Sequence, residues 1–144
     1  MIEKGEADEK VREGWLRAWM IFEVLAVSEN VAKESLESLI NRLDSDKRVR
    51  IYHKVFGELK KVAKPLPKVD SGFSLTCEVE LISKKFENLV EIVTEYGPSA
   101  IEILEPSSFE LKANEAQTIL NNVAKILHDF AAAGAGGIVL IKGK

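Results

Sequence analysis

The sequence predicts an α+β domain made of two similar halves, each a strand, a helix and a second strand. The first observation behind this is an internal similarity. Residues 22–31 (FEVLAVSENV) are echoed 55 residues later by residues 77–86 (CEVELISKKF), with the Glu, the first Val and the Ser identical. The second is that apolar residues recur at a period of two in some stretches and at helical spacing in others. The expected order is therefore β-α-β-β-α-β.

The composition is that of a soluble globular protein. The chain has 144 residues, of which 46% are hydrophobic and 30% charged, enough for one domain with a real core. Its apolar runs are far shorter than the ~20 residues of a membrane span, and its start lacks the apolar region of a signal peptide. We therefore expect a cytoplasmic protein without membrane contact. Abundant Glu and Lys with few Gln, Cys, Met and His point towards a thermophile.

The first half is read from its N-terminus. Residues 1–14 mix acids and bases with almost no apolar content, which predicts a flexible tail or a solvated helical turn. Residues 15–27 are almost continuously apolar, as in a strand covered on both faces. Ser28 is placed to cap a helix, and apolar residues at helical spacing extend that helix to Leu43. Residues 48–56 alternate again and predict a second strand.

The second half repeats this order after a longer connection. Residues 57–72 contain two prolines and predict a long loop. Residues 73–82 form the clearest strand, and Ser83 is placed to cap the helix that follows. Gly97 and Pro98 end that helix, because Gly accepts a left-handed conformation and Pro cannot continue it. Residues 100–105 predict a short last strand.

This pattern, over residues 15–106, resembles the ferredoxin-like superfold, an antiparallel sheet with two helices on one face. The two similar strands would be its central pair, and we expect them to run parallel to each other. Residues 107–144 add a helix over 113–133 and a short strand over 138–141, packed on the same domain or on a partner subunit. A superfold by itself carries little information about function.

The sheet face away from the helices is the most informative predicted surface. The first strand would present an apolar candidate interface there: Trp15, Trp19, Ile21 and Leu25. A patch of this kind is normally covered, and we expect the C-terminal helix or a second subunit to cover it. The alternative is an aromatic platform for nucleic-acid bases, which the acidic Glu78 and Glu80 of the third strand disfavour.

Basic residues are concentrated in residues 47–68, which hold eight Lys or Arg and one acid, Glu58. The candidate anion-binding residues are Arg48, Arg50, Lys54, Lys60, Lys61, Lys64 and Lys68. The first three would form a cross-strand charge ladder with Glu78 and Glu80. The lysines of the predicted loop form either a solvated face or a site for nucleic acid or a phosphorylated ligand.

Little in the sequence points to catalysis. Glu23, Glu78 and Glu80 are a candidate carboxylate site for a metal ion or for acid–base chemistry. Cys77, the single cysteine, and His53 fall on the predicted core face, where both are expected to be structural. The glycine-rich residues 134–137 follow a helix and read as its terminator rather than as a phosphate loop. We therefore predict no cofactor and no metal.

The function expected from the sequence is association rather than catalysis. We expect a non-catalytic homo-oligomer, a dimer above all, that serves as an interaction or small-ligand-binding regulatory domain. The alternative is an anion or nucleic-acid binder that uses residues 47–68. The third hypothesis is an enzyme that uses the carboxylates on the sheet.

Overall fold

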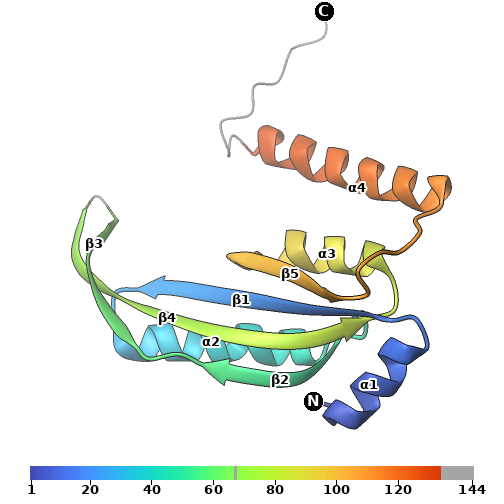
Figure 1. Cartoon of the computed structure of the whole chain (residues 1–144). Helices are drawn as coiled ribbons and strands as arrows, with labels where there is room; N and C mark the ends of the chain where they lie inside the picture. The colour runs from blue at the N-terminus through green and yellow to red at the C-terminus, as the bar shows by residue number, and fades with distance from the viewer. Residues whose placement is uncertain (67, 134–144) are drawn as a thin grey trace, which may run out of the picture. The chain divides into compact units, whose positions relative to one another are not determined.

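The structure is a computed structural model that describes residues 1–66 and 68–133, without the side chains of residues 64–66 and 69. Over these residues it has an α+β fold with four helices and a five-stranded antiparallel open sheet (Figure 1). The chain divides into two compact units at Ser108, and the second unit contains α4. In chain order the elements are α1 (Lys4–Arg12), β1 (Leu16–Ala26), α2 (Glu29–Asp44), β2 (Arg50–Phe56), β3 (Lys60–Leu66), β4 (Val69–Ser83), α3 (Phe86–Tyr96), β5 (Ala100–Glu105) and α4 (Ala113–Ala132).

The strands lie in the order β2-β4-β1-β5, and β3 pairs with the first part of β4. The two similar segments of the sequence are thus β1 and β4, central neighbours as predicted. They run antiparallel, so the expected parallel pairing was wrong. β2 runs parallel to β1 after the α2 connection, and the β3–β4 hairpin then reverses the chain, so β4 runs antiparallel to both. The β5 strand has the bounds that the sequence predicts.

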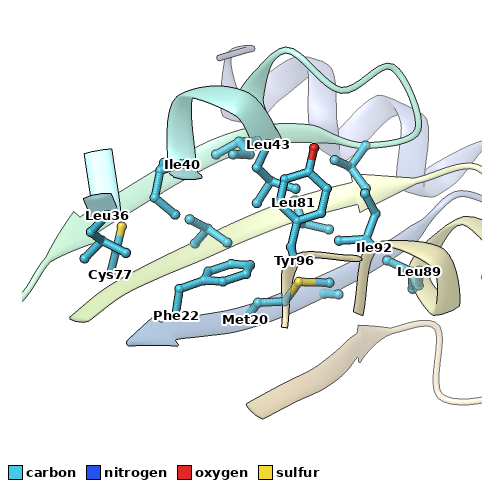
Figure 2. Close-up of a cluster of buried hydrophobic side chains, with 14 of the residues drawn as sticks. Met20, Phe22, Leu36, Ile40, Leu43, Cys77, Leu81, Leu89, Ile92 and Tyr96 are labelled. Carbon is cyan, nitrogen blue, oxygen red and sulfur yellow. The ribbon is translucent and has the colours of Figure 1, made fainter. Parts of the chain in front are cut away.

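The core lies between one face of the sheet and the helices α2 and α3. Because side chains alternate along a strand, the even-numbered residues of β1 and the odd-numbered residues of β4 point into it. Figure 2 shows Met20 and Phe22 of β1 among Leu36 and Ile40 of α2 and Ile92 of α3. All five side chains are buried. For β1, β4 and α2, the periodicity that predicted the elements also predicted which face of each one is buried.

A helix, α1, stands where the sequence predicts a flexible tail. Ala7 of α1 is fully buried against Tyr52 and Ile82, which lie on the sheet face away from α2 and α3. The segment is anchored further by the Ile2 N–H, which donates to the Ile51 carbonyl at 2.9 Å. Only a few small or aliphatic residues supply this contact. Their sparse spacing among charges explains why the sequence predicted at most a solvated turn here and not a helix packed on the sheet.

Residues 57–72, predicted as a long loop, contain β3 and the start of β4 instead. The loop prediction was wrong because Pro65 was taken to end a strand. In the structure Pro65 lies in β3, which pairs with β4 alone, and an edge strand tolerates a residue without an N–H. The hairpin lies at the end of the sheet opposite α1 (Figure 1).

A register shift in β2 changes which side chains face the core. Ile51 pairs with the buried Leu81, but His53 pairs with Glu80 on the opposite face. The extra residue between them is a bulge, which reverses the alternation beyond it. His53 is therefore exposed rather than in the core, and Lys54, opposite Val79, lies on the helix side. Strict alternation along residues 48–56 predicted the reverse for both.

The two predicted serine caps differ. The Ser28 Oγ accepts a hydrogen bond from the Val31 N–H at 3.2 Å, so the cap of α2 is confirmed. Ser83 is buried, and its Oγ donates to the Arg48 carbonyl at 2.9 Å, while Lys85 occupies the N-cap of α3. Gly97 ends α3 with a φ of 60°, the left-handed conformation expected from the sequence.

The position of the core can be tested on β1 itself. Phe22→Ala is expected to lower the free energy of unfolding by about 3–5 kcal/mol, because it leaves a cavity between β1 and α2. Leu25→Ala, on the opposite face and 53% exposed, is the matched control and should change it by less than about 0.5 kcal/mol. Denaturant unfolding monitored by circular dichroism measures both values. Equal losses would contradict the assignment of the two faces.

Candidate functional site

A pocket of about 560 Å³ lies beneath α1 on the sheet face away from α2 and α3. We call it the α1 pocket. Five elements contribute to it, and all but one of its lining residues are polar or charged: Lys4, Asp8, Arg17, Tyr52, His53, Glu80, Leu104 and Glu105. Its volume is within the range of small-molecule sites. The sequence alone did not point to it, because α1 and the β2 bulge form two of its walls.

Arg17 of β1 lies in the α1 pocket and is only 8% exposed. Its Nη2 donates to Asp8 at 2.5 Å, and its guanidinium lies 5.0 Å from the centre of the Tyr52 ring. Its Nε lies 3.0 Å from Glu105 Oε1, but it is not aligned for a hydrogen bond. Burial opposes the charge of Arg17, yet its contacts with Tyr52 and Asp8 outweigh burial and raise its pKa. This cation is therefore permanently charged and held in place.

Tyr52 and Glu80 form the second polar pair of the α1 pocket. The Tyr52 hydroxyl donates to Glu80 Oε1 at 3.2 Å. Burial raises the pKa of Tyr52 above its ordinary value, so the phenol stays a neutral donor at physiological pH. Tyr52 lies on this face by the regular alternation of β2, and the bulge after Ile51 brings His53 to the same face. Glu80 was a candidate from the sequence, but its neighbours in the pocket were not.

The four residues of the predicted apolar interface lie along one face of β1 but differ in their surroundings. Trp15 packs against the apolar cluster that joins α1 to the sheet. The Lys10 ammonium and the Arg50 guanidinium lie 5.6 and 5.3 Å from the centre of its ring. Trp19 is half-buried, and its Nε1 donates to Glu78 at 3.0 Å. Ile21 is half-buried and Leu25 is exposed. At the Trp15 end, this face of the sheet is thus covered by α1, which lies within the segment predicted as a tail.

Arg48, a predicted anion-binding residue, is already surrounded by carboxylates. It forms a two-pronged contact with Asp46, through Nε at 2.9 Å and Nη2 at 2.7 Å, and a second one with Glu95 at 2.9 and 2.6 Å. Glu91 lies 3.2 Å away and the Tyr96 hydroxyl donates to Asp46 at 2.9 Å. Paired guanidinium–carboxylate bonds of this kind are strong. Arg48 therefore joins α3 to the loop before β2, not β2 to β4.

The other predicted basic residues separate into two groups. Arg50 lies 3.3 Å from Glu6 of α1, and Lys54 lies on the helix side of the sheet. The charge ladder predicted between them and Glu78 is therefore not formed. The second group carries exposed side chains on the β3–β4 hairpin: Lys60, Lys61 and Lys68. Lys64 belongs to the same hairpin, but its side chain is outside the described part of the structure.

The three predicted carboxylates are not gathered into one site. Glu23 accepts from the Ser74 hydroxyl at 2.8 Å, Glu78 from Trp19 and Glu80 from Tyr52. Glu23 pairs across the strands with Thr76, so it lies beyond Glu78 along β4. Within the described residues no cluster of three His, Cys, Asp or Glu side chains is arranged to hold a metal ion. Cys77 is buried, and burial raises the pKa of its thiol.

A groove of about 320 Å³ runs between α3 and β5 on the helix side of the sheet. Its lining is almost entirely apolar: Phe86, Leu89, Val90, Val93, Thr94, Ile101 and Ile103. We call it the α3–β5 groove. Ile101 and Ile103 are 39% and 36% exposed. Over the described residues, β5 pairs only with β1, so its outer edge is unpaired. The sequence predicted the strand but not its exposure.

Comparison with known proteins gives a family but no activity. The sequence matches the model of the MJ0538 family over residues 17–140, so the chain belongs to this family. No individual curated protein matches it. Over residues 1–66 and 68–133, no helix combines the length and the apolar character needed to cross a membrane.

The Arg48 network predicts a specific acid sensitivity. Contact with Arg48 holds the pKa of Asp46 and that of Glu95 below their ordinary values. A carboxylate with a lowered folded-state pKa stabilises the fold above its unfolded-state pKa, and this stabilisation is lost as the pH falls through the folded-state value. Asp46→Asn should therefore cost about 1–3 kcal/mol at pH 7, and the difference from wild type should shrink below about pH 4.

Chemical denaturation at several pH values measures this difference. Asp44→Asn is the matched control, because Asp44 lies two residues away and, among the described residues, pairs with the N-terminal amine alone, at 3.2 Å. It should cost less than about 1 kcal/mol. A loss for Asp46→Asn that stays constant down to pH 3 would contradict an electrostatic role for Asp46.

Proposed function

We propose that this chain is a non-catalytic, self-associating domain that forms a two-fold dimer through the β5 edge. The observation that carries the proposal is the α3–β5 groove beside an unpaired strand edge. Apolar grooves of this kind on soluble proteins mark interaction sites. An unpaired edge offers a row of backbone N–H and C=O groups to another strand.

We also infer that the first unit is a ferredoxin-like sandwich with β3 as an addition to it. The supporting observation is the order β2-β4-β1-β5 with every pair of neighbours antiparallel. A second is that α2 and α3 contribute to one core on a single face. In this arrangement β5 is an edge strand of the sheet, and no other described strand pairs with its outer side.

A second copy of β5 is a suitable partner for this edge. Two β5 strands related by a two-fold axis run antiparallel, so their backbones can pair and join two sheets into one. The same axis places the two α3–β5 grooves next to each other, and Ile101 and Ile103 of each copy would then be covered. Such an interface uses the same surface on both subunits, as most homodimers do.

The side chains along β5 are compatible with this pairing. Glu102 lies opposite Trp19 and Ile101 opposite Met20, so charged and apolar side chains are on separate faces of the strand. The charged face would remain in solvent in the dimer. No lysine or proline lies within β5, whereas natural edge strands often use these residues to prevent association.

The dimer can be tested by replacing Ile103 with a charged residue. Ile103→Lys is expected to convert the dimer to a folded monomer, because each subunit would bury an unpaired ammonium in the joined groove. The change in mass is measured by size-exclusion chromatography with light scattering, and folding by circular dichroism. Because Ile103 is already 36% exposed, the monomer should remain folded.

Leu25→Lys is the matched control, since it introduces the same charge at an exposed position of the predicted interface on the opposite face of the sheet. It should leave the dimer intact. A dimer that dissociates with Leu25→Lys and not with Ile103→Lys would show that the face of Trp19, Ile21 and Leu25 is the interface. A monomeric wild-type protein would overturn the proposal.

The basic hairpin supports a second candidate function, the binding of nucleic acid or another polyanion. Lys60, Lys61 and Lys68 have exposed side chains without an ion pair to any residue that the structure describes. The hairpin lies at the end of the sheet away from α1 (Figure 1). A chain could therefore dimerise through β5 and still present these lysines.

This candidate predicts a salt-dependent affinity for single-stranded nucleic acid. The slope of log K against log salt should fall by roughly 1.5 when Lys60 and Lys61 are both replaced by Gln, because two phosphate contacts are lost. Lys84 and Lys85, an exposed pair before α3, provide the matched double replacement and should leave the slope unchanged. Fluorescence anisotropy with a labelled oligonucleotide measures both. No binding at low salt would exclude this function.

A further inference from the structure

The α1 pocket contains two groups of opposite charge, the Lys4 ammonium and the Glu80 carboxylate, that make no ion pair with any described residue. A third group, Arg17 with the carboxylates of Asp8 and Glu105, is paired within itself and keeps one negative charge. Glu80 accepts only the neutral phenol of Tyr52, which leaves its negative charge uncompensated. Lys4 also lines the pocket, and its ammonium makes no ion pair or hydrogen bond with any described residue.

His53 is a second hydrogen-bond donor in the pocket, besides the Lys4 ammonium. It lines the same pocket, is exposed, and makes no hydrogen bond or ion pair within the described residues. The pocket therefore offers Lys4 and His53 to an anionic group and the carboxylate of Glu80 to a cationic one. A ligand with a single charge would satisfy only one side of this arrangement.

From this distribution of charge we propose that the α1 pocket binds a small zwitterion, an α-amino acid. Its carboxylate would meet Lys4 and His53, its ammonium would meet Glu80, and its side chain would lie against Leu104, the one apolar residue of the lining. The site is independent of the proposed dimer, because its residues lie on the sheet face opposite the α3–β5 groove. It gives the domain a ligand in addition to a partner.

The fixed side chains of the pocket support a binding site. Its floor is Arg17, which is 8% exposed and fixed by Asp8 and by the Tyr52 ring. The Arg17 Nε is buried and lacks a hydrogen-bond partner within the described structure. The volume of about 560 Å³ lies within the range of small-molecule sites, in which convergent polar groups fix the orientation of the ligand.

The test uses the full-length protein and the twenty L-α-amino acids as individual probes. Thermal shift identifies the probes that stabilise the protein, because a ligand that binds only the folded state raises the melting temperature. Isothermal titration calorimetry then measures the affinity of the best one. Its carboxamide, which lacks the carboxylate, and its N-acetyl derivative, which lacks the ammonium, are the matched controls. Both are expected to bind about tenfold more weakly or worse.

Two substitutions connect the affinity to the pocket. Glu80→Gln keeps an acceptor for Tyr52 but removes the charge, and Lys4→Gln removes the ammonium. Each is expected to weaken binding about tenfold. Glu78→Gln, two residues along the same strand and face but outside the pocket, should bind as wild type does. Circular dichroism checks that all three variants are folded.

Three outcomes would overturn the proposal. The first is that no amino acid binds at millimolar concentration. The second is that the carboxamide or the N-acetyl derivative binds as well as the parent, since one of the two charges would then be irrelevant. The third is that Glu78→Gln weakens binding as much as Glu80→Gln does, which would place the site elsewhere on the sheet.

Discussion

The antiparallel pairing of β1 with β4 determines where every other side chain of the sheet lies. It comprises eleven residue pairs, from Leu16 opposite Ser83 to Ala26 opposite Phe73. This register places Met20 and Phe22 under the helices and Arg17 and Trp19 on the other face. A slip of one residue would exchange the two faces and bury the charges, so the apolar core specifies the register strongly. Both the α1 pocket and the α3–β5 groove depend on it.

Those parts of the fold that depend on local pattern were predictable from the sequence. The continuous apolar run of β1, the alternation of β4 and the cap at Ser28 are all properties of neighbouring residues. The failures have a common cause, which is that the deciding contact is distant in sequence. Ser83, like Ser28, follows an apolar strand segment, but its hydroxyl donates to the Arg48 carbonyl instead of capping its own helix. The residues that follow also differ, since Glu29 after Ser28 favours a helix N-terminus and Lys84 after Ser83 does not.

The same limit applied to the candidate sites. A run of basic residues in the sequence places Arg48 and Lys60 in one group, although Arg48 is bound by Glu91 and Glu95 from α3 and Lys60 is exposed. The α1 pocket was not predictable because the β2 bulge reverses the alternation after Ile51. Without that extra residue His53 would lie on the core face, as the alternating pattern predicted. A single inserted residue thus decides whether a histidine is structural or available to a ligand.

The edge strand β5 belongs to both candidate surfaces. Ile101 and Ile103 line the groove on one face, while Glu105 lies beside Arg17 in the pocket on the other. Ile103 pairs with Ala18 and lies on the helix side of the sheet. By regular alternation Glu105 would lie on that side too, but a register shift between Arg17 and Ala18 places it opposite Arg17, on the other face. Within the described sheet β5 is held by β1 alone, so this one short strand carries a side of the groove on one face and a wall of the pocket on the other.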